Sequence, residues 1–140
     1  MECFKTFRKA PPSQLIMTLL VKNEESMLEE NLLFHKAMGV DSFIITDNNS
    51  TDSTPEIIRK YKQKGWIKEV IEEKATDYEQ KEWVDRMIWK AKTIYKADWI
   101  INADADELWY SPSGNLKTDL SATHANVLNC EMRSVYPEEN

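Results

Sequence analysis

Short apolar runs alternate along this chain with longer stretches in which apolar residues recur every three or four positions, a pattern typical of strands and helices in turn. The apolar runs predict strands at 14–21, 42–46, 66–71 and 98–102, with a further strand over 126–135. The longer stretches predict helices at 23–38, 53–64 and 77–95, with a short helix near 119–124. This repeated strand–helix order predicts a largely parallel sheet with right-handed crossovers.

Residues at the expected helix ends support these boundaries. Asn23 stands where an N-cap side chain is expected, and Ser53 with Glu56 has the spacing of a capping box. Gly39 and Gly65 stand where a glycine in a left-handed conformation ends a helix.

Length and composition predict one globular domain. The chain has 140 residues, of which residues 1–12 are a polar segment that we expect to be a poorly ordered leader, and 13–140 the domain. A net charge of −6 argues against binding to nucleic acid or an anionic membrane surface, and no apolar run is long enough to span a bilayer. Cys3 and Cys130 are far apart with no His cluster, which favours free thiols and a cytoplasmic location.

An acidic segment directly follows the last parallel strand. The apolar residues 99–101 lead into Asp104-Ala105-Asp106-Glu107, and ligands bind at the carboxyl ends of strands in open α/β sheets. Alternate side chains share a face of an extended segment, so Asp104 and Asp106 are expected to converge, while Glu107 points elsewhere and orients a neighbour. Such carboxylates repel one another unless a cation such as Mg²⁺ or Mn²⁺ lies among them. The alternative is an ordinary acidic surface turn.

Two other strand ends carry polar residues. Lys22 and Glu24 follow the first expected strand, where they would reach a nucleotide, although a strand end and helix cap is the alternative for this segment. Asp47 ends the second strand, where its carboxylate would accept hydrogen bonds from a base or ribose, and an Asx-rich turn is the alternative. The chain contains no glycine-rich phosphate loop, so a metal would have to take over that role.

Several further residues are weaker candidates for a functional role. His35 lies on the apolar face of the first helix and is interpreted as a hydrogen-bonded core residue. Gln80 and Trp83 begin the long helix, whose amino end should face the same edge of the sheet. Arg86 follows them and would either pair with phosphate or remain a solvated helix residue.

Three segments together resemble the nucleotide-sugar half of GT-A glycosyltransferases of family 2, in the branch that also resembles family 92. The segments are Leu19–Glu25, Asp47–Thr54 and Asp104–Glu107. The resemblance implies a three-layer α/β/α fold with a mainly parallel sheet, a nucleotide-sugar donor and a divalent metal, Mn or Mg. Asn49 stands where the family usually has glycine, so Asn49 is expected in a left-handed turn.

The resemblance also implies roles for individual residues. Asp106, assisted by Asp104, would hold the metal and the diphosphate. Asp47 would contact the base or ribose, and residues 21–24 would line the nucleoside pocket, with Val21, Lys22 and Glu24 as the binding residues.

The implied reaction is an inverting, metal-dependent transfer of a sugar to a glycan, lipid or protein acceptor. After Glu107 the chain continues only to Asn140, so we expect the acceptor half to be truncated, and no residue is identified as the catalytic base. One alternative is a nucleotide- or metal-binding module without turnover. Another is a phosphatase of the aspartyl-phosphate type, which is disfavoured because the acidic motif follows the fourth expected strand and Leu108 stands where Thr or Val is usual.

Overall fold

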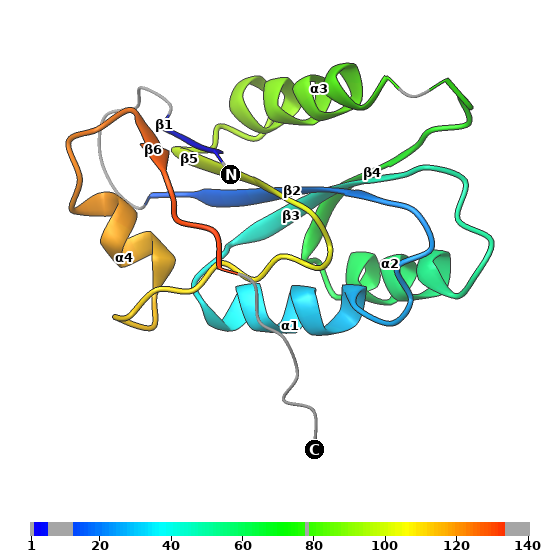
Figure 1. The fold of residues 1–140 in the computed structure, drawn as a ribbon, viewed down its shortest axis with the longest axis horizontal. Coiled ribbons are helices and arrows are strands. Elements are labelled where there is room, and N and C mark those ends of the chain that lie inside the picture. The colour runs from blue at the N-terminus through cyan, green and yellow to red at the C-terminus, as the bar shows by residue number, and fades with distance from the viewer. Residues whose placement is uncertain (1, 6–12, 78, 134–140) are drawn as a thin grey trace.

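Ten elements make up the computed structural model, which describes residues 2–5, 13–77 and 79–133 (Figure 1). In chain order they are β1 (Glu2–Lys5), β2 (Leu15–Val21), α1 (Leu28–Ala37), β3 (Ser42–Asp47), α2 (Thr54–Gln63), β4 (Ile67–Glu72), α3 (Gln80–Thr93), β5 (Trp99–Ala103), α4 (Leu116–Ser121) and β6 (Val127–Asn129). The strands form one sheet in the order β4-β3-β2-β5-β1-β6. None of the described helices is both long enough and apolar enough to cross a bilayer.

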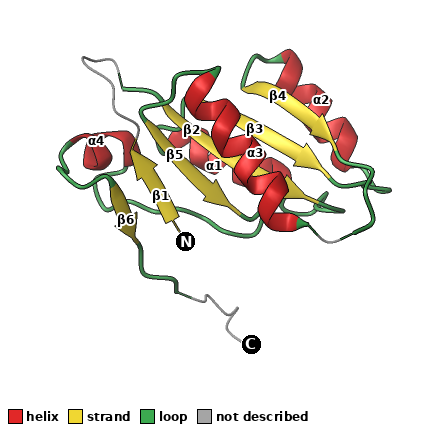
Figure 2. Cartoon of the chain, turned by 90° about the horizontal axis from the view of Figure 1, so that it is seen from above, coloured by secondary structure: helices red, strands yellow, loops and turns green. Residues whose placement is uncertain are grey.

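The sheet is mainly parallel and lies between two layers of helices. Strands β4, β3, β2 and β5 run parallel, whereas β1 pairs antiparallel with both β5 and β6. Helix α3 covers one face, and α1 and α2 cover the other (Figure 1). Figure 2 is seen from the α3 side and shows this helix lying across the parallel strands. The predicted three-layer fold is therefore confirmed.

The central strand β2 shows why the sheet needs helices on both faces. Leu15, Met17 and Leu19 are fully buried in the apolar cluster that includes α1 and α2 residues. Ile16 is equally buried on the opposite face, in the cluster that contains Met87 of α3. A strand buried on both faces has a continuous apolar sequence, which is the pattern that predicted this strand.

The expected leader is wrong for four of its residues, because Glu2–Lys5 form the strand β1. Cys3 pairs in register with Ile101 of β5 and Leu128 of β6, and its side chain is fully buried. This strand depends on pairing with segments at the other end of the chain, so nothing in the neighbouring sequence indicated it. The rest of the expected leader, residues 1 and 6–12, lies outside the described residues.

The expected cap at Asn23 is also wrong. Helix α1 begins at Leu28 with Met27 as its N-cap, and no side chain caps it. Asn23 has a left-handed backbone, with a φ of 52°, and its Oδ1 accepts a hydrogen bond from the Thr51 amide at 2.7 Å. Asn23 therefore joins two loops instead of starting a helix.

Helix α2 begins where it was expected, but its first turn is capped by a different side chain. Ser53 is its N-cap, yet the side chain makes no capping hydrogen bond, so the capping box is not formed. Instead, Asp52 Oδ1 accepts a hydrogen bond from the Thr54 amide at 2.8 Å. Both expected terminating glycines are confirmed, because φ is 97° at Gly39 and 79° at Gly65.

The last two elements differ from their expected bounds. Helix α4 starts three residues earlier than expected, at Leu116, because Asn115 is the N-cap and its Oδ1 accepts a hydrogen bond from the Thr118 amide at 3.0 Å. Strand β6 contains only Val127–Asn129, and residues 130–133 are not part of a strand.

Candidate functional site

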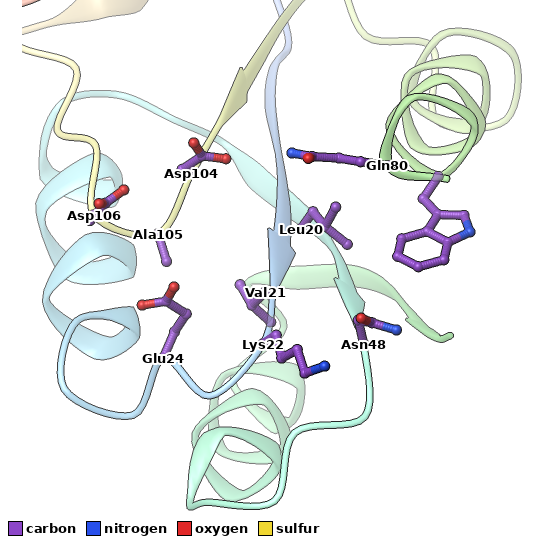
Figure 3. A pocket seen from close by; sticks show the side chains of 10 residues that line it. Leu20, Val21, Lys22, Glu24, Asn48, Gln80, Asp104, Ala105 and Asp106 are labelled. Atoms are coloured by element: carbon purple, nitrogen blue, oxygen red, sulfur yellow. The ribbon is translucent and has the colours of Figure 1, made fainter. Parts of the chain in front are cut away.

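A pocket of about 490 Å³ opens where β2, β3 and β5 end (Figure 3). Its walls come from the loops that follow these strands and from the amino end of α3, as the parallel topology predicts. The lining residues are Leu20, Val21, Lys22, Glu24, Asn48, Gln80, Trp83, Asp104, Ala105 and Asp106.

The acidic turn after β5 forms one wall of the pocket. Asp104 and Asp106 are both exposed and line the pocket, while Ala105 between them is 1% exposed and packs into the core. Glu107 is not among the lining residues. Its Oε2 accepts a hydrogen bond from the Asp104 backbone amide at 3.1 Å, so Glu107 holds the turn, as expected from its position.

Glu24 brings a third carboxylate to this wall, and in Figure 3 it points toward the turn that carries Asp106. Burial raises the pKa of the Glu24 carboxyl, and the negative charges of Asp106 and Asp104 raise it further. Burial likewise raises the pKa of Asp104, with the charge of Asp106 as the second cause. The described part of the chain has no group of three or more His, Cys, Asp and Glu side chains that could hold a metal ion. The raised pKa values show that like charges lie close together on this wall.

The loop after β3 contributes Asn48, which the sequence analysis did not identify. The Asn48 side chain is nearly buried, and its Nδ2 donates to the carbonyl oxygens of Glu73 at 3.0 Å and Ala75 at 3.1 Å. Asp47 does not line the pocket, because its Oδ1 accepts hydrogen bonds from the Ser50 amide at 3.2 Å and the Ser50 hydroxyl at 2.5 Å. Asp47 Oδ1 therefore takes part in an Asx-type turn, which was the alternative interpretation of this residue. Asn48 could have been identified from its position in the sequence, because it is the first residue after β3.

Hydrogen bonds between the loops after β2 and β3 fix the segment that carries Lys22 and Glu24. The Asn23 amide donates to Ser50 Oγ at 2.9 Å, and the Thr51 amide donates back to Asn23 Oδ1. The Glu24 amide donates to Thr54 Oγ1 at 2.9 Å. Because both loops leave adjacent parallel strands, this contact follows from the β2–β3 pairing.

Three smaller predictions have clear outcomes. Asn49 has a φ of 54°, so the expected left-handed turn is confirmed. Gln80 and Trp83 line the pocket as expected from the position of α3. Arg86 does not line it, and its guanidinium donates to Glu73 Oε2 at 2.8 Å, which makes it a residue paired within the fold.

His35 is fully buried and hydrogen-bonded, which confirms its interpretation as a core residue. Burial lowers the pKa of its imidazole to about 4, so His35 is neutral at physiological pH.

Comparison with solved structures shows the class of the fold. S. aureus TarS (residues 1–349) superposes with a TM-score of 0.57 and 18% identity, over 78% of this chain and 31% of TarS. The mannosyltransferase PcManGT from Pyrobaculum calidifontis, solved in complex with GDP-Man and Mn²⁺, superposes with a TM-score of 0.51 and 20% identity, over 70% of this chain and 29% of its own. The fold is therefore that of the GT-A glycosyltransferases.

The sequence profile of Glycosyltransferase family 92 matches residues 17–129. The chain belongs to this family. A comparison with curated proteins finds no match. The chain spans about a third of the length of each superposed structure.

Proposed function

We propose that this chain forms the nucleotide-sugar-binding part of a metal-dependent glycosyltransferase. The observation that carries the proposal is the convergence of Glu24, Asp104 and Asp106 on one pocket at the carboxyl edge of a GT-A sheet. PcManGT, which shares the fold, was solved with GDP-Man and Mn²⁺, and this supports the same kinds of ligand here.

The carboxylates of the acidic wall fit a divalent cation of the Mg²⁺ or Mn²⁺ type. Such ions are usually held by one or two carboxylates together with substrate phosphates, so a complete protein cage is not required. Asp104 and Asp106 would hold the ion, with Glu24 beside them. The raised pKa values of Asp104 and Glu24 reflect burial and a charge imbalance that a cation would relieve. When bound, the ion would neutralise charge on the departing diphosphate.

The other side of the pocket suits the nucleoside part of a donor. Val21, Lys22 and Asn48 line it, and the Lys22 ammonium provides a positive charge opposite the acidic wall. A contact between Asp47 and the base or ribose stays a prediction. It would have to use Oδ2, because Oδ1 is occupied by Ser50.

The remaining parts of the reaction lie beyond this pocket. We propose that the acceptor, a glycan, lipid or protein, attacks through a hydroxyl group and inverts the anomeric carbon. The carboxylate that would deprotonate this hydroxyl is not identified among the described residues.

Calorimetric titration of the full chain with UDP, GDP, ADP and CDP, with Mn²⁺ and then with EDTA, tests the proposal. We expect one base to bind preferentially and the binding to disappear with EDTA. Equal, metal-independent binding of all four, or none at all, would contradict it.

A nucleotide- or metal-binding module without turnover is the second candidate, because no catalytic base is identified among the described residues. Incubation with radiolabelled nucleotide sugars and Mn²⁺ separates the two candidates. Slow hydrolysis of the donor supports an enzyme, whereas tight binding without any hydrolysis supports the module. Membership of a glycosyltransferase family argues against the phosphatase alternative.

A further inference from the structure

Two buried polar side chains of α1 hydrogen-bond to the backbone of the acidic turn and of Trp109, two residues after it. Asn31 and His35 are one helical turn apart, and both are fully buried. Asn31 Nδ2 donates to the carbonyl oxygens of Ala105 at 2.9 Å and Glu107 at 3.0 Å, with Asp104 further away at 3.4 Å. These bonds reach the backbone between and beside the two pocket-lining aspartates.

The hydrogen bonds around His35 fix its tautomer. The Trp109 backbone amide donates to His35 Nε2 at 2.9 Å, so this nitrogen carries no proton. The neutral imidazole therefore has its proton on Nδ1, which donates to Asn31 Oδ1 at 3.0 Å. Because Asn31 Oδ1 accepts the hydrogen bond from His35, the Asn31 side chain is oriented with its amide hydrogens toward the acidic turn. Every hydrogen-bonding group of both side chains is thus used, and the network has one orientation.

Among the described residues, the other hydrogen bonds of the acidic turn lie within the turn itself, including the one from the Asp104 amide to Glu107 Oε2. Asp104 and Asp106 are exposed and repel each other, and Ala105 between them provides only a methyl group to the core. Within the turn, the Glu107 amide donates to the Asp104 carbonyl at 3.0 Å. The bonds from α1 therefore hold a segment that its own charges would push apart.

We propose that Asn31 and His35 are positioning residues that hold Asp104 and Asp106 in the geometry needed to share one cation. They touch neither the donor nor the ion, and they act through the backbone of residues 104–109. This role rests on the donor and metal site proposed above. The sequence assigned His35 only to the core and did not identify Asn31.

The substitution Asn31→Asp tests this role most directly. The aspartate has the same shape and still accepts from His35, but its carboxylate cannot donate to the Ala105 and Glu107 carbonyls. We expect Mn²⁺ to bind about 10–100-fold more weakly, which is the usual effect of losing an outer-shell partner. An added negative charge would by itself favour a cation, so weaker binding would not be a charge effect.

Binding is measured from the loss of the free Mn²⁺ EPR signal, at a saturating concentration of UDP or GDP, whichever the wild type binds more tightly. Leu32→Ala is the matched control, because Leu32 is a fully buried residue of the same helix that does not contact the turn by any hydrogen bond. We expect this control to lower the melting temperature without changing Mn²⁺ affinity.

A second pair of variants covers the case in which Asn31→Asp does not fold. His35→Leu removes the acceptor for the Trp109 amide, and His35→Gln restores an acceptor close to the Nε2 position. In the metal-free protein we expect hydrogen exchange at the Trp109 amide to be slow in the wild type and in His35→Gln. In His35→Leu it should be at least tenfold faster.

The outcomes separate the two proposals. Lack of metal-dependent binding in the wild type would overturn the proposed function, and with it the role of Asn31 and His35 at that site. Normal binding in the wild type that persists unchanged in Asn31→Asp or in His35→Leu would overturn the positioning role alone. Rapid exchange of the Trp109 amide in the wild type would overturn it as well.

Discussion

Asp106 is the residue whose removal should affect ligand binding and stability in opposite directions. In the metal-free protein its charge raises the pKa of Glu24 and of Asp104, second to burial in each case, so it is an unfavourable neighbour for both. Under the proposed function, the same carboxylate would become a ligand once a cation binds. Asp106→Asn keeps the shape of the side chain and removes only the charge.

The expected change in stability is small and positive. A like-charge contact near the surface costs roughly 0.2–1 kcal/mol, so relieving it should raise the free energy of unfolding by about that amount. For a chain of 140 residues this corresponds to a melting temperature higher by roughly 1–4 °C. Mn²⁺ affinity should fall by more than about 100-fold, beyond the range typical of outer-shell changes.

Differential scanning fluorimetry without metal and Mn²⁺ titration with a nucleoside diphosphate measure the two effects. Asp85→Asn is the matched control, because it removes the same charge from an exposed position of α3 outside the pocket. A melting temperature lower by more than about 5 °C in Asp106→Asn would show that the acidic turn is structural. Unchanged Mn²⁺ affinity would refute the assignment of Asp106 as a ligand.

Three further predictions concern pH, the core and one turn. Because the folded-state pKa values of Glu24 and Asp104 lie above their ordinary values of 4.5 and 3.8, the folded protein keeps protons that the unfolded chain loses as pH rises through this range. The contribution of these two carboxyls to metal-free stability, measured by urea denaturation as the difference between the wild type and the double variant Glu24→Gln/Asp104→Asn, should therefore decrease as pH rises through this range. The difference is needed because His35 and Glu69, whose pKa values are lowered, change the total stability in the opposite direction. Mn²⁺ affinity should increase over the same range; opposite slopes would contradict the assignment. Ile45→Ala, which truncates a fully buried residue of β3, should lower the free energy of unfolding by about 2–5 kcal/mol in the same assay, and a loss below about 1 kcal/mol would contradict its place in the core. Asn49→Gly and Asn49→Ala both lose the hydrogen bond from Asn49 Nδ2 to the Lys74 carbonyl, but Ala should cost about 1–2 kcal/mol more than Gly because φ at this position is 54°; equal effects of both would contradict the strain argument.

The sequence could predict the parallel sheet because its signals are local. Strands such as β2 are apolar except for one threonine, and glycines such as Gly39 mark helix ends, so short windows of sequence contain the information. The strand β1 could not be predicted in this way, since Cys3 is buried only by pairing with β5 and β6. The cap expected at Asn23 failed for a related reason, because Asn23 bonds to the loop after the neighbouring strand. The capping box expected at Ser53 failed for a local reason, because Asp52 accepts the hydrogen bond from the Thr54 amide.

Most of the candidate site was predicted from residues within three positions of a strand end, although Asn48, directly after β3, was missed. Asp104, Asp106, Lys22 and Glu24 all reach the pocket, because the carboxyl ends of parallel strands meet at one edge. The network around Asn31 was not foreseeable from spacing. A buried asparagine in a helix has the same sequence pattern whether its amide faces a neighbouring loop or an ordinary core contact, and only the packing of α1 against residues 104–109 distinguishes them.

Strand β5, which leads into the acidic turn, is paired on both of its edges. Strand β2 covers one edge, and Glu2–Lys5 at the start of the chain cover the other. Without them, β5 would present a row of open amide and carbonyl groups to other molecules, which is a common starting point for intermolecular strand pairing. Proteolytic removal of Glu2–Lys5 would therefore be expected to favour self-association through the exposed edge of β5.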